Sequence, residues 1–102
     1  MAENSLLKKL EGLEFKFQEI STLITDPSVI SDQKRYVKLN REYRELEKVL
    51  KALEGYKKLL AGIDEAKEVM ASSDDADLKE MAREELAELE PKVAPMEEEI
   101  KL

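Results

Sequence analysis

The 102-residue chain contains no cysteine and no histidine. The absence of cysteine excludes disulfides and thiolate nucleophiles, and the absence of histidine removes imidazole bases and the commonest zinc ligands. No apolar run is long enough to span a membrane, and the N-terminus carries no secretory signal. We therefore expect a cytoplasmic protein with no membrane association, no cofactor and no bound metal.

Residues that break helices or build aromatic cores are scarce. Glycine, proline and tyrosine occur three times each, phenylalanine occurs twice, and tryptophan is missing. A core must therefore consist mainly of Leu, Ile, Val, Met and Ala. Few glycines and prolines, together with abundant Glu, Lys, Leu and Ala, favour helices over strands. No segment shows the alternating pattern of a half-buried strand.

Acidic side chains outnumber basic ones by 24 to 17, but the two halves of the chain differ. Residues 1–51 contain ten bases and nine acids, whereas residues 52–102 contain seven bases and fifteen acids. An acidic total argues against a protein that coats nucleic acid with its whole surface, because phosphate contacts need a basic surface. It leaves room for a local basic stripe.

Three segments space their apolar side chains at the three- and four-residue intervals of an amphipathic helix. These segments predict helices over roughly residues 5–25, 32–71 and 75–101. The apolar stripe of the second segment runs from Tyr36 through Leu39, Tyr43, Leu46, Leu50, Leu53 and Tyr56 to Leu60, Ile63 and Met70. The stripe of the third segment begins at Leu78.

Capping and turn residues mark the boundaries of these segments. The first helix starts at a cap, Asn4 or Ser5, and ends before Pro27, because the residue that precedes proline disfavours the helical region. Ser31 or Asp32 caps the second helix. A cluster of turn residues at 72–75 separates the second helix from the third, which Asp74 or Asp75 caps.

Short connections between amphipathic helices favour antiparallel neighbours, since each apolar stripe leaves water only by facing another. The sequence therefore predicts an all-α fold, a three-helix antiparallel bundle in a single domain over residues 1–102, with a long coiled-coil-like second helix. Pro91 and Pro95 remove backbone donors, so we expect a kink or an early end of the third helix near Glu90. Because the three stripes cover one another, we expect a monomer.

The sequence assembles no recognisable catalytic or metal site. The run Glu97–Glu99 occupies adjacent helical positions, which point in different directions and do not converge as a carboxylate pair. Asp74, Asp75 and Asp77 lack the glycine and the distal glutamate of a calcium-binding loop, and capping explains them better. No glycine-rich loop that cradles phosphate is present. We expect no enzymatic activity.

One charged surface stands out, on the second predicted helix. Its bases fall within an arc of roughly 140° at about 100° per residue, opposite the apolar stripe. The candidate contact residues are Lys34, Lys38, Arg41, Arg44 and Lys48, and Lys51 lies in the same arc. Glu45 dilutes the arc and is spaced to pair with Arg41. The arc fits either a solvated face with intrahelical ion pairs or a docking face for an acidic protein or for RNA phosphates.

Two stretches carry a resemblance to a known family. The first is LITDPSVISDQKRYVKLNREY at residues 23–43, which contains a DP-x-VI-x-D-x-x-RY turn and the start of an L-x-x-EY-x-x-L continuation. The second is DADLKEMAREEL at residues 75–86. In this order and with this separation, they resemble the N-terminal domain of bacterial class I peptide chain release factors, most closely the type that reads UAA and UAG. The resemblance covers nearly all of the chain.

The resemblance implies a function. Full-length members enter the ribosomal A site at a stop codon, read it with a tripeptide motif, and trigger peptidyl-tRNA hydrolysis with a Gly-Gly-Gln loop. This chain contains neither Gly-Gly-Gln nor Pro-x-Thr, and its helical pattern persists to Leu102. We therefore expect a fragment, the first domain of a longer factor, without the codon-reading and Gly-Gly-Gln domains.

By the same resemblance, the domain is a ribosome-docking module that directs termination at UAA and UAG. It implies as partners the stalk base of the large ribosomal subunit and the class II release factor, a GTPase. The alternative is a structural coiled-coil adaptor or oligomerisation module unrelated to the ribosome, since the apolar spacing fits both.

Overall fold

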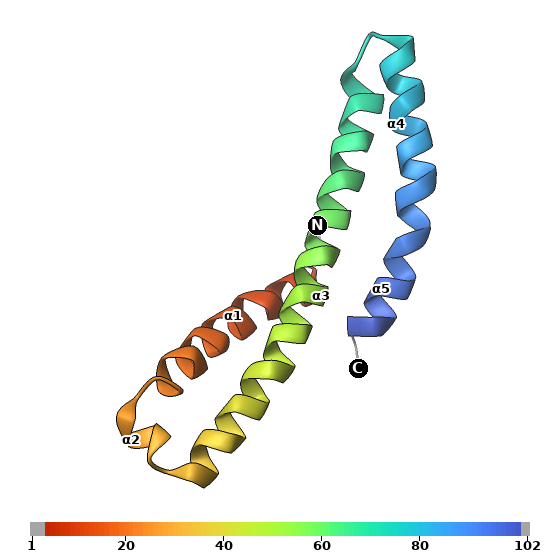
Figure 1. Cartoon of the computed structure of the whole chain (residues 1–102). Helices are drawn as coiled ribbons and strands as arrows, with labels where there is room; N and C mark the ends of the chain where they lie inside the picture. The colour runs from red at the N-terminus through yellow and green to blue at the C-terminus, as the bar shows by residue number, and fades with distance from the viewer. Residues whose placement is uncertain (1–3, 101–102) are drawn as a thin grey trace. The chain divides into compact units, whose positions relative to one another are not determined.

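The structure is a computed structural model that describes residues 4–100 (Figure 1). Within these residues it consists of helices and short turns and contains no strand. The all-α class is therefore confirmed, together with the long second helix. The elements in chain order are α1 (Ser5–Leu23), α2 (Pro27–Ile30), α3 (Gln33–Ser72), α4 (Ala76–Leu89), the 3-10 turn η1 (Glu90–Lys92) and α5 (Val93–Ile100).

The helices form two compact units. The first contains the described residues up to Leu53, and the second contains those from Glu54 onward. α3 contributes one half to each unit. Helix length is the physical reason for this division, because α3 has 40 residues and α1 only 19. The predicted stripes therefore meet in pairs on separate halves of α3.

In the first unit, α1 and the first half of α3 form an antiparallel hairpin that α2 closes at one end (Figure 1). The rings of Phe17 and Tyr43 stack between the two long helices, with centroids 4.6 Å apart and planes 25° from parallel. Tyr43 belongs to the predicted apolar stripe of the second segment, and Phe17 meets it from α1. The buried apolar side chains of this unit are Leu10, Ile20, Val29, Leu50 and Leu53.

In the second unit, α4 and α5 run antiparallel to the second half of α3 (Figure 1). A Cβ atom placed on Gly62 lies only 3.3 Å from Cδ1 of Leu89, so the glycine permits a close approach of α4 to α3. The Tyr56 hydroxyl donates a hydrogen bond to Oε2 of Glu97 and so joins α3 to α5. The buried apolar side chains here are Tyr56, Leu59, Ile63, Ala66 and Ala82.

Side-chain caps fix where the helices begin. Asn4 Oδ1 accepts hydrogen bonds of 3.0 and 3.2 Å from the backbone N–H groups of Leu6 and Leu7 at the start of α1. Asp75 Oδ1 accepts bonds of 2.8 and 3.3 Å from the backbone N–H groups two and three positions ahead, at the start of α4. These caps satisfy amide donors that have no partner inside the helix.

The interruption expected near Glu90 is a single 3-10 turn. α4 ends at Leu89, and α5 starts at Val93. Pro91 has no N–H to offer the preceding helical turn, whereas Pro95 lies in the first turn of α5, where an N–H has no intrahelical partner. The third predicted helix is therefore two helices, and its expected end at residue 101 lies outside the described residues.

Candidate docking surface

A corner built from local hydrogen bonds turns the chain from α1 into α3. Asp26 Oδ1 accepts a 2.9 Å bond from the backbone N–H of Ser28 and a 2.8 Å bond from its hydroxyl. Pro27 occupies the first position of α2, where its missing N–H removes no helical bond. Sequence spacing predicted a turn here and missed the short helix, because a single helical turn is too short to show periodicity.

The bonds at this corner favour the ionised form of Asp26. The backbone N–H of Ser28 and then the Ser28 hydroxyl hold the pKa of the Asp26 carboxyl below its usual value. Burial opposes this effect, and the charge of Arg35 adds a weaker lowering. Asp32 follows and caps the start of α3, since its Oδ1 accepts a 3.3 Å bond from the backbone N–H of Arg35. The corner therefore fixes the starting point of the charged helix.

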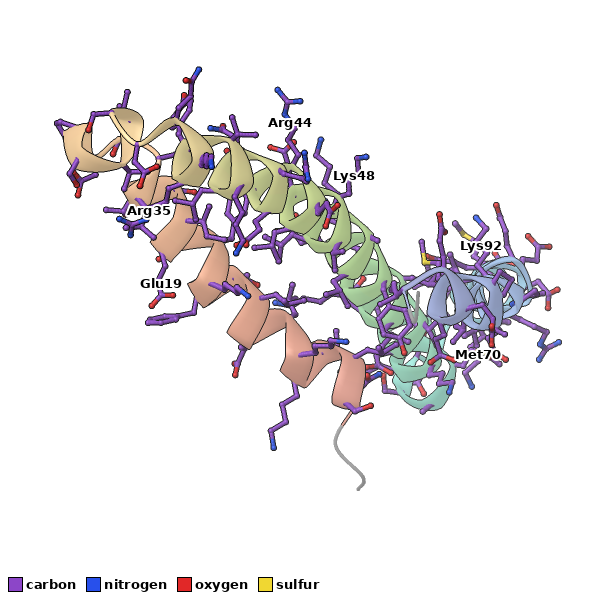
Figure 2. The ribbon with its side chains drawn as sticks, turned by 90° about the horizontal axis from the view of Figure 1, so that it is seen from below. Glu19, Arg35, Arg44, Lys48, Met70 and Lys92 are labelled. Carbon is purple, nitrogen blue, oxygen red and sulfur yellow. The ribbon has the colours of Figure 1, made fainter. Side chains whose placement is uncertain are left out.

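The first half of α3 carries a basic face, which comprises Lys34, Lys38, Arg41, Arg44, Lys48 and Lys51. All six side chains are exposed. Figure 2 shows Arg44 and Lys48 projecting from α3 on the side away from α1. The opposite side of the helix carries Leu50, which is buried, and Tyr43, which is half-buried. The structure thus brings the predicted contact residues to one face, and their role as contacts stays a prediction.

Within residues 4–100, no ion pair neutralises the basic face. In the part of the chain that the structure describes, none of its six bases lies within 4.0 Å of a carboxylate, and the pair between Arg41 and Glu45 that the spacing allows is not formed. Arg83 and Glu80 on α4 do pair, at 3.3 Å. Unneutralised like charges in one row repel one another, and an anionic partner relieves that repulsion.

Two shallow hollows adjoin on this face at Val37 and Arg41. One has a volume of about 570 Å³ and includes Asn40 and Arg44, and the other has about 420 Å³ and includes Lys34. Val37 is 51% exposed and offers an apolar contact among the bases. Sequence reasoning missed Val37. The available signal was an apolar residue inside the basic arc, because at about 100° per residue Val37 falls between Arg44 and Lys48.

One member of each acidic cluster outside this face has a structural role. Asp75 caps α4, and Glu97 accepts the hydrogen bond of Tyr56. Among residues 4–100, no three Asp or Glu side chains gather closely enough to hold a metal ion. Within the same range, no helix combines the length and the apolar character needed to cross a membrane.

Together, these observations define a class, that of an all-α domain of helical hairpins with a charged outer face. The family model of the PCRF domain matches residues 13–102, and the chain belongs to this family. The family resemblance inferred from the two sequence stretches is confirmed.

Curated relatives with the name Peptide chain release factor 1 match almost the whole chain. The protein of Parabacteroides distasonis is 57% identical over 102 residues, which are 100% of this chain and 28% of the relative. That of Bacteroides fragilis is 54% identical over 99 residues, or 97% of this chain and 27% of the relative. That of Clostridioides difficile is 46% identical over 97 residues, which are 95% of this chain and 27% of the relative. The chain therefore spans less than a third of each of these relatives. No solved structure matches it.

Proposed function

We propose that this chain is the N-terminal domain of a peptide chain release factor, and that it supports translation termination at UAA and UAG by docking on the ribosome. The observation that carries the proposal is 57% identity over the whole chain to a protein with the name Peptide chain release factor 1. Membership of the PCRF domain family does not favour the alternative of an unrelated coiled-coil adaptor.

The basic face of α3 is the proposed contact with the ribosome. Its bases are exposed and carry no ion pair among the described residues. Lys34 to Lys48 span a row of roughly 20 Å at a rise of 1.5 Å per residue. Phosphates in ribosomal RNA suit such a row, because arginine binds phosphate through paired N–H groups and lysine as a point charge. The stalk base of the large subunit is the proposed location.

The domain is proposed to have no reaction of its own. Its sequence lacks the Gly-Gly-Gln and Pro-x-Thr motifs that belong to other domains of release factors. Codon reading and peptidyl-tRNA hydrolysis then belong to the larger part of the factor, and this domain supplies affinity and orientation in the cytoplasm. The class II release factor GTPase is a second proposed partner, and a monomer is the proposed state of the isolated domain.

Charge reversal in the full-length factor tests the docking proposal. The variant Lys38→Glu, Arg41→Glu, Lys48→Glu changes six units of charge on the basic face. A matched control, Lys57→Glu, Lys58→Glu, Lys67→Glu, makes the same change at exposed positions of α3 in the second unit. Circular dichroism checks that both variants keep their helix content.

We expect the first variant to lose ribosome affinity and termination rate at low salt, and the control to lose less. The difference between the two should shrink as salt rises, because salt screens contacts between exposed charges. Unchanged affinity and rate in the first variant at low salt contradict the proposed role of the basic face. Equal losses in both variants assign the effect to net charge rather than to this surface.

A further inference from the structure

A second feature of the first unit lies at the seam between α1 and α3, beside the basic face. There a hollow of about 240 Å³ is lined by Lys16 of α1 and by Glu42, Glu45, Leu46 and Val49 of α3. We call it the seam hollow. Its volume is below the roughly 300–1,000 Å³ of sites that enclose a small-molecule ligand. A single protruding side chain fits it better.

The seam hollow combines an apolar floor with two acceptors. Val49 is 37% exposed, and Leu46 is half-buried. Glu42 and Glu45 stand three positions apart on α3, so their Cβ atoms are neighbours at about 5–6 Å. Within residues 4–100, neither carboxylate forms an ion pair, and Lys16 does not approach either within 4.0 Å.

This chemistry selects a cation with an aliphatic stem. Methylene groups of the stem cover Leu46 and Val49, while the charged head remains at the rim. A guanidinium presents its N–H donors as a planar fork and can bridge two carboxylates, whereas an ammonium is a compact point charge. Nucleic acid is disfavoured at this hollow, because its phosphates would meet Glu42 as well as Glu45, with Lys16 as the one base in the lining. We propose that the seam hollow is a docking site for an arginine side chain of a partner protein.

The seam hollow adjoins the basic face, which takes an anionic partner, since Glu45 lines hollows on both. Glu42, Leu46 and Val49 line the seam hollow and not the larger hollow of the basic face. The test uses the 102-residue chain and a capped leucine-arginine-leucine tripeptide as the probe. Methyl NMR signals of Leu46 and Val49 are followed during titration. We expect shifts at these two residues, and we expect the same tripeptide with citrulline in place of arginine to produce none, because citrulline keeps the shape without the charge.

Two double variants test whether binding of the arginine peptide depends on the seam hollow or only on the number of acidic side chains. Glu42→Gln, Glu45→Gln should weaken the binding of the arginine peptide about fivefold, the effect of about 1 kcal/mol expected for an exposed ion pair. Glu65→Gln, Glu68→Gln has the same spacing on α3, with both parent side chains exposed, and should leave binding unchanged.

A third variant uses the lysine of the seam hollow. Lys16→Gln removes a like charge and should strengthen binding of the arginine peptide. Shifts that persist in Glu42→Gln, Glu45→Gln, or equal shifts with the citrulline peptide, overturn the proposal. Failure of the ribosome experiment on the basic face leaves this result unaffected.

Discussion

The Tyr56 hydroxyl lies 2.6 Å from Oε2 of Glu97, a residue 41 positions further along the chain. Tyr56 is 1% exposed, and Glu97 is half-buried. A hydroxyl that donates to a carboxylate forms a short, charge-assisted bond, stronger than a bond between neutral groups. It fastens α5 to α3 beyond the 3-10 turn at Pro91, where the backbone ladder is interrupted.

Removal of this hydroxyl tests what the bond contributes. Tyr56→Phe keeps the buried ring and should lower the free energy of unfolding by about 1–2 kcal/mol, near the low end for hydrogen bonds to charged groups, because water reaches the freed Glu97 carboxylate. Urea unfolding followed by circular dichroism measures the change. Glu98→Gln, at an exposed neighbouring position, is the control and should change stability by less than about 0.5 kcal/mol. Equal stability of Tyr56→Phe and the parent would show that the bond contributes nothing net.

The stacked pair of Phe17 and Tyr43 joins α1 to α3 in the first unit. A double-mutant cycle with Phe17→Leu and Tyr43→Leu should yield a coupling energy of about 0.5–1.5 kcal/mol, because offset aromatic rings attract beyond their buried area. Urea unfolding of the parent, the two single variants and the double variant supplies the four free energies. Additive single effects would contradict a specific ring–ring interaction.

Acid should weaken the corner at Asp26. Because hydrogen bonds from Ser28 lower the pKa of Asp26 in the folded chain, its ionised form stabilises that state above the ordinary value of 3.8. This contribution is lost as the pH falls through the lowered pKa. The stability difference between the parent and Asp26→Asn should therefore be largest near neutral pH and shrink in acid.

Carboxyl NMR titration gives a direct readout of the same interaction. Ser28→Ala removes the hydroxyl but keeps the backbone N–H, so it should raise the pKa of Asp26 part of the way toward its ordinary value. A pKa of Asp26 that does not respond to Ser28→Ala contradicts the role of the hydroxyl.

Two glycines should respond differently to alanine. No atom lies within 4 Å of a Cβ placed on Gly12, so Gly12→Ala should stabilise the chain by about 1 kcal/mol through helix propensity. At Gly62 the same atom lies 3.3 Å from Cδ1 of Leu89, so part of that gain is lost to displacement of the leucine. Thermal and urea unfolding of both variants show which substitution raises the stability more. A larger stability gain for Gly62→Ala than for Gly12→Ala contradicts the close approach of α4.

Periodicity predicted most of the helical content, because helix faces are a property of local spacing. It identified Leu50, Leu53 and Tyr56 as core residues, and all three are buried. Beyond Tyr56 it selected Leu60, whereas Leu59 is buried and Leu60 half-buried. A straight helix has 3.6 residues per turn and drifts away from a strict heptad, so the buried stripe shifts along α3.

Features that depend on how two helices pack together could not be predicted from the sequence. Leu78 begins the predicted stripe of the third segment but is 49% exposed at the start of α4. The bond between Tyr56 and Glu97 depends on how α5 packs after the 3-10 turn, which spacing does not encode. The basic face was predictable because it lies on one helix. The seam hollow was not, because Lys16 belongs to α1 and its other lining residues to α3.

The corner between α1 and α3 also bears on the order of folding. Its hydrogen bonds join near neighbours, such as the backbone N–H of Ile30 to the carbonyl of Asp26 and that of Tyr36 to the carbonyl of Asp32, each at four positions' separation. Closing such short loops costs little entropy, and contacts of this kind form early. The corner needs no distant partner, so during synthesis the chain can turn back on itself before the second unit has been made.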